Sequence, residues 1–250
     1  MSKKLVSDLL VDYLERRGVT KLFGLCGHTV IGMLDALSRS KKIEYIGTRH
    51  EAIASTAADG YARITHKASV VMCHLGPGLT NVITGVANAS LDSIPMVAIT
   101  GNVPNDLLGR DSFQEVNITG ITMPITKHNF IVQNVEDLAA VVRKAFVIAN
   151  SGRKGPVLID IPKDVTAAHS EYVKLPRYRI RKLPKVDDVV FEQALEVIRR
   201  AERPMIYAGG GIISSNATRE LMNFSRHMDI PICCSMMGLG SVPYDYDLYM

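Results

Sequence analysis

The stretch Ser69-Val70-Val71-Met72-Cys73-His74, followed by Gly76-Pro77-Gly78 and a run of small residues from 80 to 91, decides the fold of this chain. Its first part is almost continuously apolar, which is typical of a parallel strand covered on both faces. The glycine–proline–glycine segment predicts a break, and the small-residue run predicts a helix. A buried strand that leads through a turn into a helix is the repeating unit of an α/β protein.

Strand and helix patterns alternate on both sides of this stretch. Gly18 ends the first predicted helix, and Thr29 is the expected N-cap of the second. The short spacing between elements predicts a doubly wound parallel sheet. The predicted helices cover 6–17, 30–37, 52–63 and 137–150, and the further predicted strands cover 21–25, 43–46, 96–100 and 157–161.

The composition changes after residue 170, and this change suggests the domain boundaries. We expect one domain over 1–170, a basic linker over 171–187 and a second α/β unit over 188–250. Its prolines and charges predict that the linker is an extended connector. Nucleic-acid binding is the alternative, but the stretch contains no recognisable nucleic-acid-binding module. The second unit holds too few strands for a complete sheet, so we expect the sequence to be the front part of a longer protein. The basic linker residues are Lys174, Arg177, Arg179, Arg181, Lys182 and Lys185.

The bulk composition is that of an ordinary globular protein. The chain has 250 residues, of which 47% are hydrophobic and 22% charged, and a net charge of +4. No run of about 18 apolar residues occurs, so no membrane span is expected. The four cysteines and seven histidines show no metal-ligand spacing. We therefore expect reduced, buried thiols, no metal site in this chain and a cytoplasmic location.

Glu51 is the strongest single candidate for a functional residue. A predicted strand ends just before the stretch Thr48-Arg49-His50-Glu51, and a helix containing Ala58-Asp59-Gly60-Tyr61-Ala62-Arg63 follows it. The acid is thus expected at the carboxyl end of a strand, where α/β sheets bind ligands. Taken alone, such a glutamate is most often a charge at a helix start or a surface residue.

Three later segments have the features of binding loops. Gly76-Pro77-Gly78-Leu79-Thr80-Asn81 opens a helix, where glycines let the backbone approach a ligand and free N–H groups remain. Residues 92–104 join a helix to a strand and a loop, and residues 109–115 lie in a long loop, where binding residues concentrate. Each segment alone is common in proteins, so the evidence for a binding site is the order of all the segments along the chain.

Together these segments resemble the acetohydroxyacid (acetolactate) synthase large subunits, a family of thiamine-diphosphate enzymes. The resemblance implies a pyrimidine-binding domain over 1–170 and a partial Rossmann-like central domain over 188–250. It implies decarboxylation of a 2-oxo acid such as pyruvate with carboligation, in branched-chain amino-acid biosynthesis; a 2-oxo acid decarboxylase or lyase of the same superfamily is the alternative. The matching motifs, in order, are RHE, DGYAR, GPGLTN, LDSIPMVAITG, FQE, ITKHN, SGRKGPVLIDIPKDV, GGG and MGLG.

The resemblance also assigns roles to single residues. It implies that Glu51 hydrogen-bonds N1′ of the cofactor's aminopyrimidine ring, and that Pro77 and Asn81 line the pyrimidine pocket. Gln114 is implied as a catalytic residue, and the residues expected to face the substrate are Phe113, Gln114 and Lys163.

A second cofactor is possible in this family, in which some members hold a structural FAD. The triple glycine at 209–211 is not a dinucleotide fingerprint by itself, because G-x-G-x-x-G needs glycine where Ser214 stands. The positions that match the FAD contacts of the family are Arg153, Gly209, Gly211, Met236 and Gly238.

His28 departs from the family pattern, which has glycine at this position. A histidine here is able to act as a general acid or base near neutral pH, which makes it a catalytic candidate and puts the acetolactate product in doubt. Equally, it could be a strand-end residue that only bonds the backbone. His74 is expected to be a hydrogen-bonded core residue rather than a ligand, and Arg63 to pair with Asp59 one helical turn earlier.

Part of the expected site is missing from the sequence. The family's diphosphate-and-magnesium motif, GDG followed by an asparagine, does not occur in the 250 residues. The resemblance places that motif, and the Mg²⁺ it holds, in a third domain, so this chain is expected to hold half a site and to be inactive alone. It further implies a homodimer or homotetramer. The alternatives are a non-catalytic module that binds a ligand or partner, and a split enzyme.

Overall fold

The computed structural model describes residues 3–176 and 185–250. The chain divides into two compact units between residues 178 and 179, inside the linker expected at 171–187. Residues 177–184 of that linker, with Arg177, Arg179, Arg181 and Lys182, lie outside the described residues. The domain boundaries at 170 and 188 stay a prediction.

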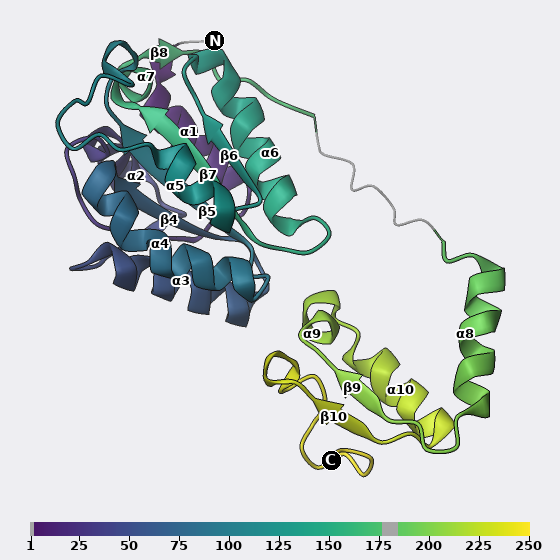
Figure 1. Ribbon diagram of the computed structural model, residues 1–250. Coiled ribbons are helices and arrows are strands. Elements are labelled where there is room, and N and C mark those ends of the chain that lie inside the picture. Colours follow the sequence, from purple (N-terminus) through teal and green to yellow (C-terminus); the bar gives the residue numbers. More distant parts are fainter. Residues whose placement is uncertain (1–2, 177–184) are drawn as a thin grey trace. The chain divides into compact units, whose positions relative to one another are not determined.

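The described part of the first unit is built on a six-stranded parallel sheet (Figure 1). Each pair of neighbouring strands runs in the same direction. This confirms the doubly wound α/β fold class predicted from the alternating patterns. In spatial order the strands are β3 (Glu44–Gly47), β2 (Lys21–Gly24), β4 (Ser69–His74), β5 (Met96–Asn102), β7 (Pro156–Pro162) and β6 (His128–Ile131).

Helices cover both faces of this sheet and enclose two hydrophobic clusters. One cluster lies under α1 (Val6–Arg16), α2 (Ile31–Arg39) and α6 (Leu138–Asn150). The other lies under α3 (Glu51–Thr65) and α4 (Gly76–Leu91). Every residue of β5 and β7 is buried, as expected for central strands with both faces covered.

Shorter elements complete this unit. The loop after β5 carries the 3₁₀ turn η1 (Asn105–Leu107), and α5 (Ile118–Thr122) with η2 (Met123–Ile125) leads into β6. The 3₁₀ turn η3 (Val135–Asp137) precedes α6. The pair β1 (Lys4–Leu5) and β8 (His169–Ser170) is antiparallel, and α7 (Lys163–Ala167) follows β7.

Three local predictions are wrong. Thr29 is not an N-cap: Val30 occupies that position without a side-chain cap, and the Thr29 hydroxyl bonds other groups described below. The helix after β4 begins at Gly76 rather than Thr80, because proline is well tolerated in the first turn of a helix. Cys26 is exposed rather than buried, and Cys233 and Cys234 are only partly buried, whereas Cys73 is buried as expected; all four cysteines are free.

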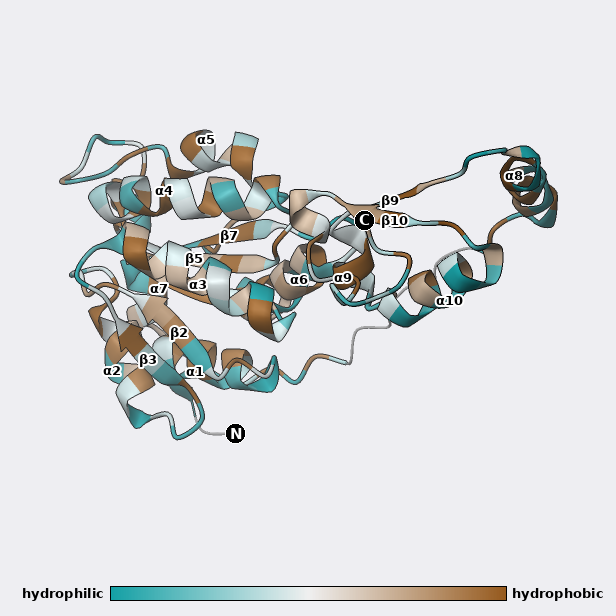
Figure 2. Ribbon diagram, turned by 90° about the horizontal axis from the view of Figure 1, so that it is seen from below, coloured by the Kyte–Doolittle hydropathy of each residue, from teal (hydrophilic) through white to brown (hydrophobic). Residues whose placement is uncertain are grey.

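The second unit is smaller and contains a two-stranded parallel sheet of β9 (Ile206–Ala208) and β10 (Ile232–Cys234). Around it lie α9 (Gly211–Ser215), α10 (Thr218–Met228) and the 3₁₀ turn η4 (Met236–Gly238). The helix α8 (Asp188–Arg200) has no buried residue, and strongly hydrophobic and strongly hydrophilic positions alternate along it (Figure 2). None of the helices in the described ranges is long and apolar enough to cross a membrane.

Candidate functional site

The candidate site lies where the carboxyl ends of the central strands meet. Because parallel strands present these ends on one edge of a sheet, the loops after them come together. His28 follows β2, His74 ends β4, and Lys163 follows β7. The structure thus brings together residues that are far apart in the sequence.

The two helices α3 and α4 hold the central pair of the site, Glu51 and Asn81. Glu51 is the first residue of α3 and only 8% exposed, and Asn81 lies on the second turn of α4. The Asn81 Nδ2 amide donates a 2.9 Å hydrogen bond to Glu51 Oε2. A Cβ at Gly78 would lie 3.3 Å from Glu51 Oε1, so glycine at this position keeps side-chain atoms away from the carboxylate.

A close crossing of the same two helices fixes the distance between these residues. Ser55 lies one turn after Glu51, and Gly85 lies one turn after Asn81. A Cβ at Gly85 would lie 2.3 Å from Ser55 Oγ and 2.9 Å from the Ser55 carbonyl carbon. The absence of a side chain at Gly85 is therefore what lets α3 and α4 approach.

The loop after β5 brings Gln114 to the start of α4. Gln114 has a φ of 60°, and a Cβ at Gly76 would lie 1.9 Å from the Gln114 carbonyl oxygen. The Glu115 carboxylate accepts backbone hydrogen bonds from Gly109 at 2.6 Å and Ser112 at 3.0 Å, and these bonds lower its pKa. The Glu115 carboxylate thus holds the two ends of the loop together, and the Gln114 backbone packs against Gly76.

His74 stands at the centre of a hydrogen-bonded chain across the site. Its Nδ1 lies 2.9 Å from Thr29 Oγ1, and its Nε2 lies 2.8 Å from Gln114 Oε1. The ring of His28 lies edge-on to it, with the centroids 5.1 Å apart. Burial, and then the nearby His74 and Lys163, lower the pKa of His28. The prediction that His74 is hydrogen-bonded is confirmed, but the ring is only half-buried and links two loops.

Asp160 is a buried acid that the sequence analysis did not single out. It is 1% exposed on β7 and accepts hydrogen bonds from Thr100 Oγ1 at 2.7 Å and Asn102 Nδ2 at 2.6 Å. Burial raises the pKa of Asp160 to about 6, although these two hydrogen bonds act to lower it. The sequence does contain a sign of this residue, because Asp160 is the one acid in an otherwise apolar strand, Val157-Leu158-Ile159-Asp160-Ile161.

We expect Asp160 to make the stability of the chain depend on pH. Its folded pKa of about 6 exceeds the usual aspartate value of 3.8, so its contribution is fully present below about pH 4 and is lost as pH rises through 6. In urea unfolding of this chain, the stability of wild type relative to Asp160→Asn should fall by up to about 1.4 kcal/mol per pH unit in that window. The exposed-residue control Asp106→Asn should follow wild type; a difference between wild type and Asp160→Asn that does not vary with pH would contradict the expectation.

The residues matched to FAD contacts fall in different units. In the second unit the segments after β9 and β10 are neighbours: a Cβ at Gly238 would lie 2.2 Å from the Ala208 carbonyl oxygen, and Met236 is 85% exposed. Arg153 belongs to the first unit, where its guanidinium donates to Ser93 Oγ at 2.8 Å and the Leu91 carbonyl at 3.0 Å. Arg153 has these local partners. The match of Arg153 to an FAD contact stays a prediction, as do those of Gly209, Gly211, Met236 and Gly238.

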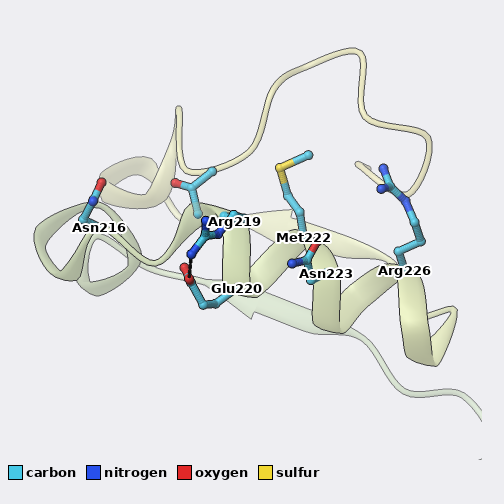
Figure 3. A pocket seen from close by; sticks show the side chains of 7 residues that line it. Asn216, Arg219, Glu220, Met222, Asn223 and Arg226 are labelled. Carbon is cyan, nitrogen blue, oxygen red and sulfur yellow. Dashed lines mark hydrogen bonds and ion pairs between the residues drawn. The ribbon is translucent and has the colours of Figure 1, made fainter.

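A depression of about 520 Å³ on the second unit does not include any of those candidates (Figure 3). Its walls come mainly from α10, and Arg219 forms an ion pair with Glu220 there at 3.0 Å. No group of three or more histidine, cysteine or acidic side chains suited to a metal occurs among the residues that the structure describes. The lining residues are Asn216, Thr218, Arg219, Glu220, Met222, Asn223 and Arg226.

Two family models match the chain. Residues 4–121 match the thiamine pyrophosphate enzyme N-terminal TPP binding domain, and residues 191–250 match the thiamine pyrophosphate enzyme central domain. The chain belongs to the thiamine pyrophosphate enzymes. This agrees with the resemblance inferred from the ordered motifs.

Curated relatives narrow the comparison to one kind of enzyme in that family. The chain is 44% identical over 246 residues to the acetolactate synthase large subunit of Corynebacterium glutamicum, covering 96% of this chain and 39% of the relative. It is 43% identical to the acetolactate synthase large subunit of Buchnera aphidicola subsp. Acyrthosiphon pisum, covering 96% and 43%. It is 41% identical to the chloroplastic acetolactate synthase of Arabidopsis thaliana, covering 97% and 37%. The chain thus spans about two fifths of the relatives' length.

The structure brings most of the predicted site residues to one edge of the first unit. Glu51 and Asn81 are paired, Gln114 reaches His74, and Lys163 influences His28. Pro77 is exposed in the first turn of α4, and Phe113 is 78% exposed on the loop beside Gln114. The roles of these residues stay predictions. His74, expected only as a hydrogen-bonded core residue, and the buried Asp160 are further polar residues of this part of the unit.

Proposed function

We propose that this chain is the pyrimidine-binding part of a thiamine-diphosphate enzyme that decarboxylates a 2-oxo acid and joins the product to a second carbonyl compound. The observation that carries the proposal is the buried Glu51 carboxylate, bonded to Asn81 through Oε2 and bordered by Gly78 on its Oε1 side. The 41–44% identity to acetolactate synthases over nearly the whole chain supports the same activity.

The residues present fit the aminopyrimidine ring of the cofactor. The described residues give Glu51 Oε1 no hydrogen bond, so one carboxylate oxygen is anchored and the other is available to a ring nitrogen. Pro77, exposed next to Gly78 in the first turn of α4, is proposed to provide an apolar wall for the ring. When bound, thiamine diphosphate supplies the carbon nucleophile and the electron sink. The task of Glu51 is to hold a proton at the ring nitrogen, and the task of Asn81 is to orient the carboxylate.

The remaining parts of the proposed site lie outside this chain. The diphosphate and its Mg²⁺ would be held by a further domain, which fits the greater length of the relatives. We propose an oligomer in which that domain meets the Glu51 edge, a cytoplasmic location, and an FAD held by Gly209, Gly211, Met236 and Gly238. A test of the FAD is the absorbance spectrum of the purified complete enzyme.

His28 is proposed to control which product leaves the site. His28 is exposed at the edge beside His74, and partial loss of solvent, followed by the nearby His74 and Lys163, lowers its pKa. The imidazole of His28 is able to accept a proton from a reacting group and, once protonated, to deliver it to the product. This observation favours the runner-up function, simple decarboxylation of the 2-oxo acid, in which the product is protonated instead of joined to an acceptor.

The substitution His28→Gly in the complete enzyme tests both the activity and this role. With pyruvate, we expect wild type to release CO2, and the variant to change the ratio of acetolactate to acetaldehyde by roughly 10-fold or more, because a positioned general acid contributes about 10²–10⁴. The products are measured by NMR, with His169→Gly on β8 as control. An unchanged ratio removes His28 from the mechanism, and absence of any 2-oxo acid consumption overturns the proposed function in favour of a non-catalytic module.

A further inference from the structure

The hydrogen bonds around His74 restrict the protons that this side chain carries. The Thr29 hydroxyl has one hydrogen, and it donates that hydrogen to the Gly101 carbonyl at 3.0 Å. Thr29 Oγ1 also lies 2.9 Å from His74 Nδ1, so at that contact the oxygen accepts and Nδ1 carries a hydrogen. A Cβ at Gly101 would lie 2.7 Å from Thr29 Oγ1, so the loop is tightly seated and the hydroxyl keeps these two partners.

The opposite ring nitrogen decides how the Gln114 amide is oriented. If Nε2 also carries a hydrogen, His74 is an imidazolium and donates to Gln114 Oε1, which is the 2.8 Å contact seen here. If Nε2 carries none, it is an acceptor and the amide must turn over so that its NH2 group donates. One proton on His74 thus selects which end of the Gln114 amide faces the ring and which end faces outward.

We infer that His74 is a positioning residue whose protonation turns the Gln114 amide, so that a protonated His74 presents the Gln114 NH2 group to the 2-oxo acid and a neutral His74 presents the carbonyl oxygen. This rests on the proposed function. A 2-oxo acid offers only acceptors, namely its carboxylate and ketone oxygens, so it binds better to the NH2 group. The KM for the 2-oxo acid therefore rises with pH as His74 loses its proton, while the C2–H exchange that depends on Glu51 does not change with it.

The loop geometry explains why a change of proton on His74 turns the Gln114 amide and does not move the loop. The backbone of Gln114 has a left-handed φ of 60°, and its carbonyl oxygen packs against Gly76, where an added Cβ would lie 1.9 Å away. The amide is therefore the part that turns. A Cβ at Gly27 would lie 2.3 Å from His74 Cβ, so the ring is seated just as closely on the loop before α2.

Three titratable or charged groups lie in this part of the site. His28 faces the His74 ring from the loop before α2, and Lys163 at the start of α7 acts on His28 in turn. Glu51 lies on the other side, near Gly78, whose added Cβ would touch both Glu51 Oε1 and His74 Cβ. Because His28 is a second imidazole beside the His74 ring, the two side chains must be tested separately.

The tautomer of His74 is measurable by NMR in this chain, without cofactor or turnover. In protein labelled with ¹⁵N-histidine, long-range correlations of the neutral ring at high pH should show the hydrogen on Nδ1 and a bare Nε2. The His74 ring is assigned by its contacts to the ring of His28. A neutral ring with its hydrogen on Nε2 contradicts the inference, because Nδ1 would then have no hydrogen for Thr29.

The variant His74→Gln separates positioning from packing in the complete enzyme. Its amide is able to donate to Gln114 at every pH, so we expect the low-pH KM throughout, whereas the wild-type KM should rise roughly 2- to 10-fold with pH, the size of one hydrogen bond. His28→Asn should keep the pH step in KM, and so should the control His169→Gln. A His74→Gln enzyme with the wild-type pH step overturns the inference.

The two proposals fail in distinguishable ways. If the complete enzyme turns over no 2-oxo acid, the proposed function fails, and the tautomer still reports on His74. If the enzyme is active but its KM does not change with pH, or His28→Asn alone removes the step, the inference about His74 fails and the proposed function stands. If His74→Gln does not fold, the tautomer and the pH dependence of the wild-type KM decide.

Discussion

Replacing Glu51 by glutamine is expected to slow exchange of the thiazolium C2 hydrogen in the complete enzyme by about 10²–10⁴, the usual size of a general acid–base contribution. A glutamine cannot take a proton from a ring nitrogen and return it, whereas the carboxylate can. The substitution keeps the shape of the site, because its amide oxygen still accepts the bond from Asn81 that Glu51 Oε2 accepts at 2.9 Å. The effect should therefore come from lost proton transfer rather than from lost folding.

The measurement is hydrogen–deuterium exchange at C2 of enzyme-bound thiamine diphosphate, followed by NMR after acid quenching. Glu136→Gln, at an exposed position in η3, makes the same chemical change away from the site and should exchange at the wild-type rate. If the Glu51→Gln enzyme binds the cofactor and exchanges the C2 hydrogen as fast as wild type, the role proposed for Glu51 is refuted, and with it the pyrimidine site.

The parts of the fold that were predicted correctly depend on local patterns. The apolar run from Ser69 to His74 is β4, and the ion pair between Arg63 and Asp59 forms one helical turn apart, with N···O at 3.0 Å. Both follow from periodicity, which a sequence displays directly. The strand β6 at 128–131 was missed because it is short, lies at the sheet edge and has only two half-buried residues.

The candidate site was predictable only where its residues belong to recognisable motifs. Glu51 and Asn81 lie 30 positions apart, yet both stand in motifs of the family, so their meeting was expected. The chain from Thr29 through His74 to Gln114 joins residues 45 and 40 positions apart and has no sequence signature. The expected N-cap role of Thr29 failed for the same reason, since a tertiary contact with Gly101 took its hydroxyl.

The second large effect expected is on stability, at the crossing of α3 and α4. Gly85→Ala should destabilise the chain by about 1–3 kcal/mol, the usual cost of overpacking a close contact. The new Cβ would lie 2.9 Å from the carbonyl carbon of Ser55, which is backbone and cannot rotate away, and 2.3 Å from Ser55 Oγ. This clash must exceed the helix propensity that alanine gains over glycine, which is about 0.5–1 kcal/mol.

Gly60→Ala is the matched control, because Gly60 lies inside α3, the helix that crosses α4, and an added Cβ at Gly60 meets nothing within 4 Å. It should gain the propensity without the clash and stabilise the chain by about 0.5–1 kcal/mol. Urea unfolding of the two variants therefore gives changes of opposite sign. Since Ser55 and Gly85 each lie one turn beyond Glu51 and Asn81, helices pushed apart at Gly85 should also weaken thiamine diphosphate binding in the complete enzyme. If Gly85→Ala stabilises the chain as Gly60→Ala does, the close helix crossing is wrong, and the distance between Glu51 and Asn81 is set by something other than Gly85.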